Sequence, residues 1–306
     1  PAAGRDIRRL VAQASVFPIA EKRNMITRLF SSLGEIGVKT VYMMSDGNGI
    51  ADRIRHALET PLPSGQTWPR IVFLDMPIED RAVDTLVAVE KMVEHGVGGI
   101  IVLGGDGTHR LVASRAGDVP ITALSTGTNN VFPAMREATI AGLAAGLVAM
   151  GQVPVTAGAI RNKVLRIDVN GIETDLALVD LCTSTELWVG SRALWRAEGL
   201  DQLFLSFAEA DAIGLSSIGG LLRPVARAAE GGLWLNLADP ATAPIVIAAP
   251  LAPGLMINIG IEEVHDLHPG EAINLRAERG VVALDGEREL EFSQNDKLVV
   301  RLEWDG

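Results

Sequence analysis

The sequence has one cysteine, few basic residues and no long apolar run that reads as a continuous helix. Cys182 is the single cysteine among 306 residues, which excludes an internal disulfide and is typical of a reducing compartment. The formal net charge is −11 and no cluster of Lys and Arg offsets it, which argues against a nucleic-acid partner. We therefore expect a cytoplasmic protein in which Cys182 is packed in the core.

Two uncharged stretches resemble membrane spans, but neither is expected to cross a membrane. Residues 138–160 are rich in small residues and are interrupted around Gly151 and Pro154, whereas a span needs about 20 continuous apolar residues. Residues 243–261 contain three prolines, which prevent a long helix. We interpret the first stretch as a buried helix followed by a linker, see no signal peptide, and expect no membrane span.

What the sequence does contain is enough apolar material for two globular domains, with 48% apolar and 21% charged residues. In the first 150 residues, short apolar runs alternate with amphipathic stretches, and this alternation predicts a parallel sheet covered by helices on both faces. The strands expected are 38–44, 71–74, 100–103 and 121–124, and the helices are 21–33, 50–58, 79–94 and 110–115. Ligands of such sheets bind beyond the carboxyl ends of the strands. Several polar residues follow these strands directly, namely Asp46, Asp75, Asp106 and Ser125.

The central feature is the segment 99–108, Gly-Ile-Ile-Val-Leu-Gly-Gly-Asp-Gly-Thr. A buried strand ends at Gly104, Gly105 and Gly107, and these three glycines surround one acid, Asp106. Thr108 stands where the N-cap of the following helix is expected. Glycines let backbone amides approach a phosphate, and a helix N-terminus favours negative charge, so the segment predicts an anion-binding loop. A plain turn with Asp106 as a local cap is the alternative.

A second polar loop, Ser125-Thr126-Gly127-Thr128-Asn129-Asn130, follows the next strand. Its hydroxyls and amides suit hydrogen bonding to ribose or phosphate, and we expect Thr126, Gly127, Thr128 and Asn130 to bind the ligand. The alternative is an asparagine-rich turn that caps the chain from Val131 onward.

From residue 151 the pattern changes to short strands, so we divide the chain into a nucleotide-binding domain, 1–150, and a β-rich, sandwich-like domain, 151–306. Asn170-Gly171 is a hairpin signal between the strands 163–169 and 174–182. Residues 188–228 are expected to be helical in pieces. Further strands are expected at 233–237, 245–248, 256–259, 272–277, 281–284 and 298–302, and the cleft between the domains is the expected binding site.

The Gly-Gly-Asp-Gly-Thr segment resembles the signature of the NAD kinase and diacylglycerol kinase superfamily, and the chain as a whole resembles the acetoin-catabolism X proteins. The resemblance implies that the loop holds the phosphates of ATP and that Asp106 serves in catalysis or Mg²⁺ binding. The second loop resembles the Gly-Thr-Gly-Asn-Asp segment of lipid kinases at Gly127, Thr128 and Asn130. Residues 1–5 either resemble the turn that follows the first strand of this superfamily or form a frayed terminus.

Asp285-Gly286-Glu287 is a tight turn that carries two acids. Lipid kinases have Asp-Gly-Glu at the resembling position, where the Glu has been assigned a base role, whereas NAD kinases have Asp-Gly-Gln. The resemblance therefore makes Glu287 a second catalytic candidate. The proline pair of residues 249–253 resembles a strand junction of NAD kinases, and it favours the interpretation in which Glu287→Gln is nearly silent. A hairpin turn with a solvated Glu is the alternative.

Other polar residues are weaker candidates. Val179-Asp180 stands where NAD kinases have a pair that grips the NAD ribose, and Asp180 is expected either to face the cleft or to be solvated. The acids and histidines of residues 262–268 are expected in a solvated loop rather than a metal site. His109 is expected to be a surface histidine at a helix start.

The resemblance implies transfer of the γ-phosphoryl group of ATP, with Mg²⁺ bridging the phosphates, to a hydroxyl acceptor. The expected acceptor is the adenosine ribose of NAD, and we expect a homo-oligomer. Two alternatives remain: a kinase for another small molecule or a lipid, and a nucleotide-binding regulatory protein without turnover.

Overall fold

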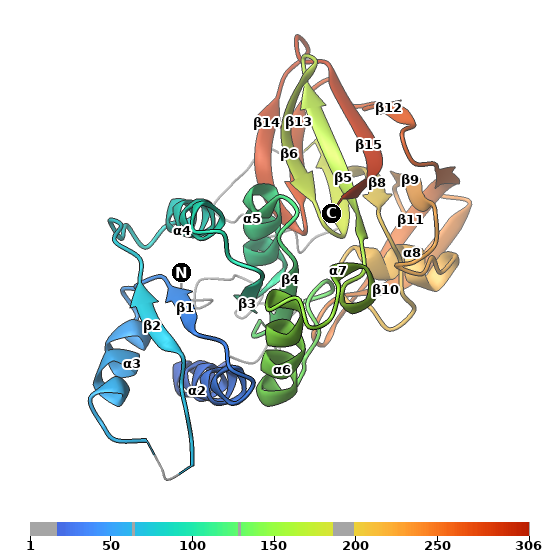
Figure 1. The fold of residues 1–306 in the computed structure, drawn as a ribbon. Coiled ribbons are helices and arrows are strands. Elements are labelled where there is room, and N and C mark those ends of the chain that lie inside the picture. The colour runs from blue at the N-terminus through green and yellow to red at the C-terminus, as the bar shows by residue number, and fades with distance from the viewer. Residues whose placement is uncertain (1–16, 63–64, 128–129, 186–198, 306) are drawn as a thin grey trace.

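The computed structural model describes residues 17–62, 65–127, 130–185 and 199–305. The segments 1–5 and 188–198, and Thr128 and Asn129 of the second polar loop, lie outside the described residues. Figure 1 shows an N-terminal part of short strands and helices beside a C-terminal part built mainly of strands.

The N-terminal part alternates strands and helices, as the sequence predicts. The strands form two separate two-stranded parallel sheets rather than one continuous sheet. β1 pairs with β2, and β3 pairs with β4. The strands are β1 (Thr40–Met43), β2 (Arg70–Phe73), β3 (Ile100–Gly104) and β4 (Ile121–Ser125). The helices are α2 (Ile19–Glu35), α3 (Ile50–Leu58), α4 (Ala82–Glu94), α5 (Asp106–Ala116), α6 (Ala138–Ala149) and the single turn α7 (Val155–Gly158).

Helices α2 and α6 pack against each other through glycine. A Cβ atom on Gly142 would lie 2.1 Å from the Ser32 hydroxyl, and one on Gly146 would lie 2.4 Å from the Ile36 side chain. The small residues that make the stretch 138–160 look membrane-like therefore let two helices approach closely. In the part of the chain that the structure describes, no helix has the length and apolar character that spanning a membrane requires.

The C-terminal part consists of two antiparallel sheets. The seven-stranded sheet has the order β10 (Ile245–Ala252), β11 (Leu255–Leu267), β9 (Gly232–Ala238), β8 (Leu200–Leu205), β7 (Asp180–Ser184), β13 (Gly280–Leu284) and β14 (Glu287–Phe292). The four-stranded sheet has the order β12 (Ala272–Asn274), β15 (Leu298–Asp305), β5 (Asn162–Val169) and β6 (Ile172–Ala177).

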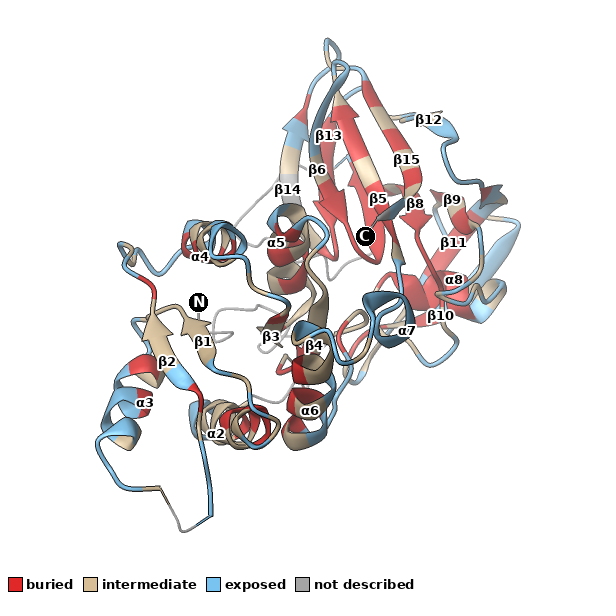
Figure 2. Ribbon diagram, viewed as in Figure 1, coloured by how far each residue is buried: buried red, intermediate tan, exposed pale blue. Residues whose placement is uncertain are grey.

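The two sheets pack face to face over an apolar core that includes Leu165, Val282 and Val300. Strand alternation divides β8 between two cores, because Phe204 faces the other sheet while Leu203 and Leu205 face the opposite way, towards a cluster that includes residues of helix α8 (Ser216–Leu222). Figure 2 shows the buried residues concentrated in these strands. The expected fold class, an α/β part with parallel strands followed by a β-rich sandwich, is confirmed, and Cys182 is fully buried in β7.

Several predicted elements differ in detail. The expected strand 174–182 is two strands, β6 and β7, because the chain leaves one sheet and enters the other at Leu178 and Val179. The expected helical region 188–228 contains strand β8, and β14 was not predicted, because its sequence Glu-Arg-Glu-Leu-Glu-Phe is mostly charged. Residues 262–267 are not a loop but the end of β11, which pairs with β9.

Replacing Gly142 with Leu is expected to lower the free energy of unfolding by about 1–3 kcal/mol, the usual cost of overpacking a close contact. Ala144 lies on the exposed face of the same helix, so Ala144→Leu is the matched control and should be nearly neutral. Urea unfolding of both variants measures the effect. Equal loss in the two variants would contradict the close packing of α2 on α6.

Candidate functional site

The glycine loop leads directly from β3 into α5, and the helix begins earlier than predicted. Gly105, not Thr108, is the N-cap residue, with extended backbone angles, and Asp106 is already in the first turn. Thr108 instead packs on Gly104, where a Cβ atom would lie 2.7 Å from the Thr108 Cβ. The predicted cap is wrong because Gly105 can leave the strand without a side chain and its carbonyl accepts from Thr108 and His109.

The Asp106 carboxylate connects the two polar loops. It accepts hydrogen bonds from the backbone N–H of Val131, at 3.0 and 3.2 Å, and from that of Phe132, at 2.8 Å. These donors are 25 and 26 residues away along the chain. Asp106 is therefore more than a local cap, since it fixes the end of the second loop against the start of α5.

Asn130 lies between the two loops. Its Nδ2 donates to the Ser125 hydroxyl at 2.8 Å. Its Oδ1 is so close to two glycines that a Cβ atom on Gly105 would lie 2.8 Å from it, and one on Gly127 would lie 2.5 Å from it. These glycines are needed for the loops to interlock around Asn130. A Cβ atom on Gly107, by contrast, would be in ordinary contact with its surroundings.

The Asp285-Gly286 turn joins β13 to β14, with φ of 50° and 76° at its two residues. The Asp285 carboxylate is buried and accepts from the backbone N–H groups of Leu178, Val179 and Asp180, where the chain changes sheets. Burial raises the pKa of Asp285, while these hydrogen bonds and the positive charge of Arg110 oppose the rise. Asp285 is thus a structural residue of the turn.

Asp180 is buried rather than solvated, and its Oδ1 accepts from the Gly286 N–H at 3.1 Å. Sequence reasoning did not single out Arg110, whose buried guanidinium on α5 pairs with Asp175 of β6 at 2.7 Å. The turn and α5 are therefore held in fixed positions by charged groups from both parts of the chain.

Glu287, the first residue of β14, reaches the glycine loop from the sandwich. Its Oε2 lies 3.9 Å from the position that a Cβ atom on Gly107 would take. Within the described residues its carboxylate has no hydrogen-bond or ion-pair partner. The structure thus brings together Gly107 and Glu287, next to Asp106, while Thr128 lies outside the described residues.

Two buried polar atoms at the loops lack a partner within the described residues, the Thr126 hydroxyl and His109 Nε2. His109 is 1% exposed, so the predicted surface histidine is wrong, because the ring turns inward and pairs through Nδ1 with the Gly105 carbonyl at 2.8 Å. A carbonyl only accepts, so the neutral ring carries its proton on Nδ1. Burial lowers the pKa of His109, and the hydrogen bond to the Gly105 carbonyl opposes this.

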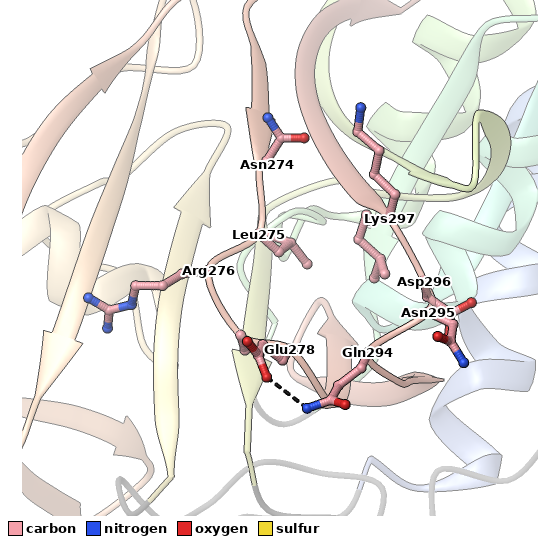
Figure 3. A pocket seen from close by; sticks show the side chains of 10 residues that line it. Asn274, Leu275, Arg276, Glu278, Gln294, Asn295, Asp296 and Lys297 are labelled. Carbon is pink, nitrogen blue, oxygen red and sulfur yellow. Dashed lines mark hydrogen bonds between the residues drawn. The ribbon is translucent and has the colours of Figure 1, made fainter.

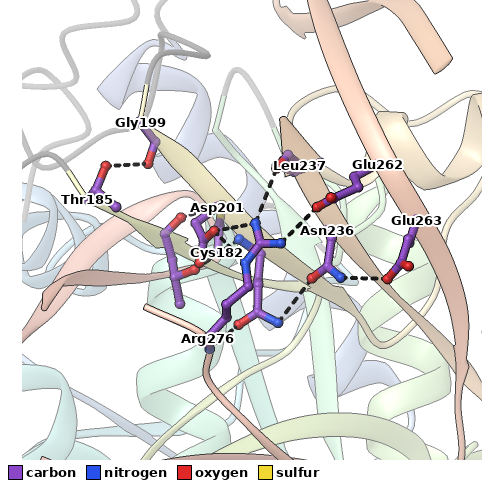
Figure 4. A network of polar contacts seen from close by, with 11 residues as sticks. Cys182, Thr185, Gly199, Asp201, Asn236, Leu237, Glu262, Glu263 and Arg276 are labelled. Carbon is purple, nitrogen blue, oxygen red and sulfur yellow. Dashed lines mark hydrogen bonds and ion pairs between the residues drawn. The ribbon is translucent and has the colours of Figure 1, made fainter. Parts of the chain in front are cut away.

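A pocket of about 290 Å³ lies elsewhere, between the segments 274–278 and 294–298. It is at the opposite end of β14 from Glu287, and Figure 3 shows that polar side chains line it. Two acids of residues 262–268 belong to a nearby network, in which Glu262 pairs with Arg276 and Glu263 accepts from Asn236 (Figure 4). Across the described ranges no group of three or more His, Cys, Asp or Glu side chains is arranged to hold a metal ion.

Comparison with known proteins divides the chain in the same region where its architecture changes. The family model of the ATP-NAD kinase N-terminal domain matches residues 18–153, and that of the acetoin catabolism protein X C-terminal domain matches residues 163–305. Acetoin catabolism protein X of Cupriavidus necator is 44% identical over an alignment of 306 positions, which covers 99% of this chain and 85% of that protein.

Two solved structures are also similar. Yeast NADH kinase complexed with NADH is 15% identical, with a TM-score of 0.49 over 92% of this chain and 76% of that one. An NAD kinase from Archaeoglobus fulgidus in complex with ATP is 14% identical, with a TM-score of 0.37 over 87% of this chain and 90% of that one.

The lowered pKa of His109 predicts a pH-dependent stability. Below the ordinary histidine pKa of about 6.5, the unfolded chain takes up a proton that the folded chain refuses, so stability falls as the pH falls, by at most about 1.4 kcal/mol per pH unit. His109→Asn keeps an N–H donor but does not titrate, so it should remove this contribution. Urea unfolding between about pH 7 and about pH 5 measures it. His268→Asn, at an exposed position, is the control, and identical pH profiles for all three proteins would refute the assignment.

Proposed function

Because the chain belongs to the acetoin catabolism protein X family and its residues 18–153 match the ATP-NAD kinase N-terminal domain, we propose that it is an ATP-dependent phosphotransferase. It transfers the γ-phosphoryl group of ATP to a hydroxyl of a small molecule, and the adenosine ribose of NAD is the expected acceptor. Residues 1–150 act as the nucleotide-binding domain and residues 151–306 as the substrate-binding domain. The observation that carries the proposal is the approach of Glu287, from the sandwich, to the glycine loop at the start of α5.

The start of α5 has the properties of a phosphate site. The first amides of a helix have no carbonyl within the helix to donate to, and the helix dipole favours an anion there. Gly107 differs from the other glycines of the loop, because a Cβ atom there would meet no close neighbour. This room supports direct contact between the Gly107 amide and a phosphate. Gly104, Gly105 and Gly127 contribute by letting Thr108 and Asn130 approach closely. The buried Thr126 hydroxyl, which lacks a partner among the described residues, is a further candidate for the ligand.

A magnesium ion bound together with the phosphates is compatible with the charges of this site. Phosphates beside Asp106 and Glu287 would bring like charges together, so a cation is needed. Mg²⁺ is usually held by one or two carboxylates together with substrate phosphates, and this agrees with the lack of a larger ligand cluster among the described residues. Asp106, oriented by two backbone amides, is the protein ligand that we propose. When bound, Mg²⁺ would neutralise charge that develops on the transferred group.

Glu287 is the group that we propose accepts the proton of the acceptor hydroxyl. The Asp106 carboxylate already accepts hydrogen bonds from Val131 and Phe132, whereas the Glu287 carboxylate has no partner within the described residues. A proton acceptor needs a free lone pair within reach of the hydroxyl. The geometry therefore favours a base role for Glu287, although the proline pair in the sequence favours a silent one. Because the base role resembles that of the lipid kinases, a lipid or another small molecule is the alternative acceptor.

Thermal-shift measurements with ATP, NAD and NADP, each with and without Mg²⁺, test nucleotide binding, because a ligand of the folded state raises the melting temperature by mass action. ATP and NAD should both give a shift, and NADP alone would instead favour a regulatory protein. Gly107→Ala should remove most of the ATP shift by filling the phosphate position. Its melting temperature without ligand should not fall, since Ala is favoured over Gly in a helix by about 1 kcal/mol. A full ATP shift in Gly107→Ala would contradict the phosphate site.

Glu287→Gln should lower kcat by about 100-fold or more, the usual contribution of a general base, and should leave ATP affinity within about threefold of the parent. Glu291→Gln is the matched control, since Glu291 is an exposed carboxylate on the same strand. Steady-state kinetics with the acceptor that proves active, together with ATP titration, measure both quantities. Turnover of Glu287→Gln equal to that of Glu291→Gln would exclude the base role.

A further inference from the structure

Arg227 connects the sandwich to the second polar loop. It lies in the segment between α8 and β9, and its Nη1 donates to the Phe132 carbonyl at 2.8 Å. Its Nη2 donates to the Val131 carbonyl. The same guanidinium donates through Nε and Nη2 to the Glu209 carboxylate at 3.2 to 3.3 Å. The planar guanidinium of an arginine carries five N–H donors, so it can donate to two carbonyls and a carboxylate at once.

The guanidinium is also held by aromatic rings. Its central carbon lies 4.3 Å from the centre of the Phe207 ring and 5.7 Å from that of Phe132. Such contacts orient an arginine as well as attract it. Phe207 is itself buried, and it belongs to an apolar cluster in which Val131 and Phe132 pack against the sandwich. Arg227 therefore has a defined position, although a third of its side chain is exposed.

The segment that carries Arg227 is anchored on both sides. Ala208 and Val225 exchange two backbone hydrogen bonds at 2.8 Å just before it. The buried side chain of Lys163, on β5, donates to the carbonyls of Ala226 and Gly231 on either side of it. Because this segment is fixed to the sandwich, Arg227 can hold the backbone that it binds in a fixed position relative to the sandwich.

Arg227 and Asp106 hold the same two residues from opposite directions, and both bind the peptide group that joins Val131 to Phe132. The N–H groups of Val131 and Phe132 donate to the Asp106 carboxylate on α5, and their carbonyls accept from Arg227. Asn130, whose side chain lies against Gly105 and Gly127, directly precedes Val131 and Phe132. Asp106 and Arg227 hold the shared peptide group on both edges, and each also holds the neighbouring group on one side, which fixes the direction in which the chain leaves residue 130.

We infer that Arg227 is a positioning residue, which holds residues 130–132 from the sandwich side and so sets the ligand affinity of the loop that includes Thr126, Gly127 and Asn130. The inference rests on the proposed function in one respect, namely that this loop binds nucleotide. It makes nucleotide binding in the N-terminal part depend on a side chain of the C-terminal part.

Three variants of the full chain separate this role from general stability. Arg227→Met keeps an unbranched apolar side chain but loses every donor. Arg227→Lys keeps the positive charge opposite Glu209 but lacks the fork that reaches both carbonyls. Arg223→Met is the matched control, because Arg223 begins the same connection and forms an exposed ion pair with Asp266.

Hydrogen–deuterium exchange read by mass spectrometry reports the hold on the loop without any ligand. In Arg227→Met, amides of the peptide that covers residues 130–132 should exchange about tenfold faster, since local exchange follows local opening. Arg227→Lys should be intermediate, and Arg223→Met should match the parent. Unchanged exchange in Arg227→Met, or an equal rise in peptides throughout the protein, would overturn the positioning role.

Titration of ATP with Mg²⁺ by calorimetry tests the consequence for binding. The dissociation constant should rise about tenfold in Arg227→Met, as expected for loss of preorganised hydrogen bonds, and should be unchanged in Arg223→Met. Faster exchange with an unchanged dissociation constant would overturn the effect on affinity. A parent protein that binds no ATP would instead overturn the proposed function, and the exchange data would still decide whether Arg227 holds the loop.

Discussion

The structure of the site depends on one set of hydrogen bonds, those from the backbone of Val131 and Phe132 to the Asp106 carboxylate. Backbone donors away from water need acceptors, and outside a helix or a strand a carboxylate is a strong one. Because Asp106 is in the first turn of α5, the same bonds fix the second polar loop relative to the helix N-terminus. Interlocking of Asn130 with Gly105 and Gly127 follows from that placement, since it requires the loops to be within contact distance.

Charged residues at the junction solve a similar problem on the sandwich side. The chain changes sheets at Leu178 and Val179, which frees backbone N–H groups, and the buried Asp285 accepts from them. Asp285 also starts the turn that directs Glu287 towards Gly107. The cost of burying this carboxylate is offset by three backbone donors and by the nearby Arg110. The buried Asp285 thus both stabilises the point where the chain changes sheets and sets the direction in which Glu287 points.

Local signals in the sequence predicted the local features of the structure. Asn170 and Gly171 form the expected hairpin turn, with φ of 56° and 82°, and the alternation of strands and helices predicted the α/β part. Contacts between distant residues left no such signal. The partners of Asp106 are about 25 residues away and the two carbonyls that Arg227 binds are about 95 residues away, so neither pairing has a periodicity that one sequence can reveal. His109 stands at a helix start, which favours a surface position, whereas packing buries its ring near Phe132.

Under the proposed function, the arrangement would also give the two acids separate tasks, as their shared charge requires. Two carboxylates beside a phosphate repel it and each other, so a site that keeps both must give them different surroundings. Asp106 is oriented by backbone amides and belongs to the loop itself, while Glu287 extends from another part of the chain and has no partner among the described residues. An acid that is built into the loop suits a fixed role beside the phosphates. An acid brought by the sandwich suits the base role proposed for Glu287, because an acceptor bound by the sandwich would then meet this carboxylate together with the phosphate.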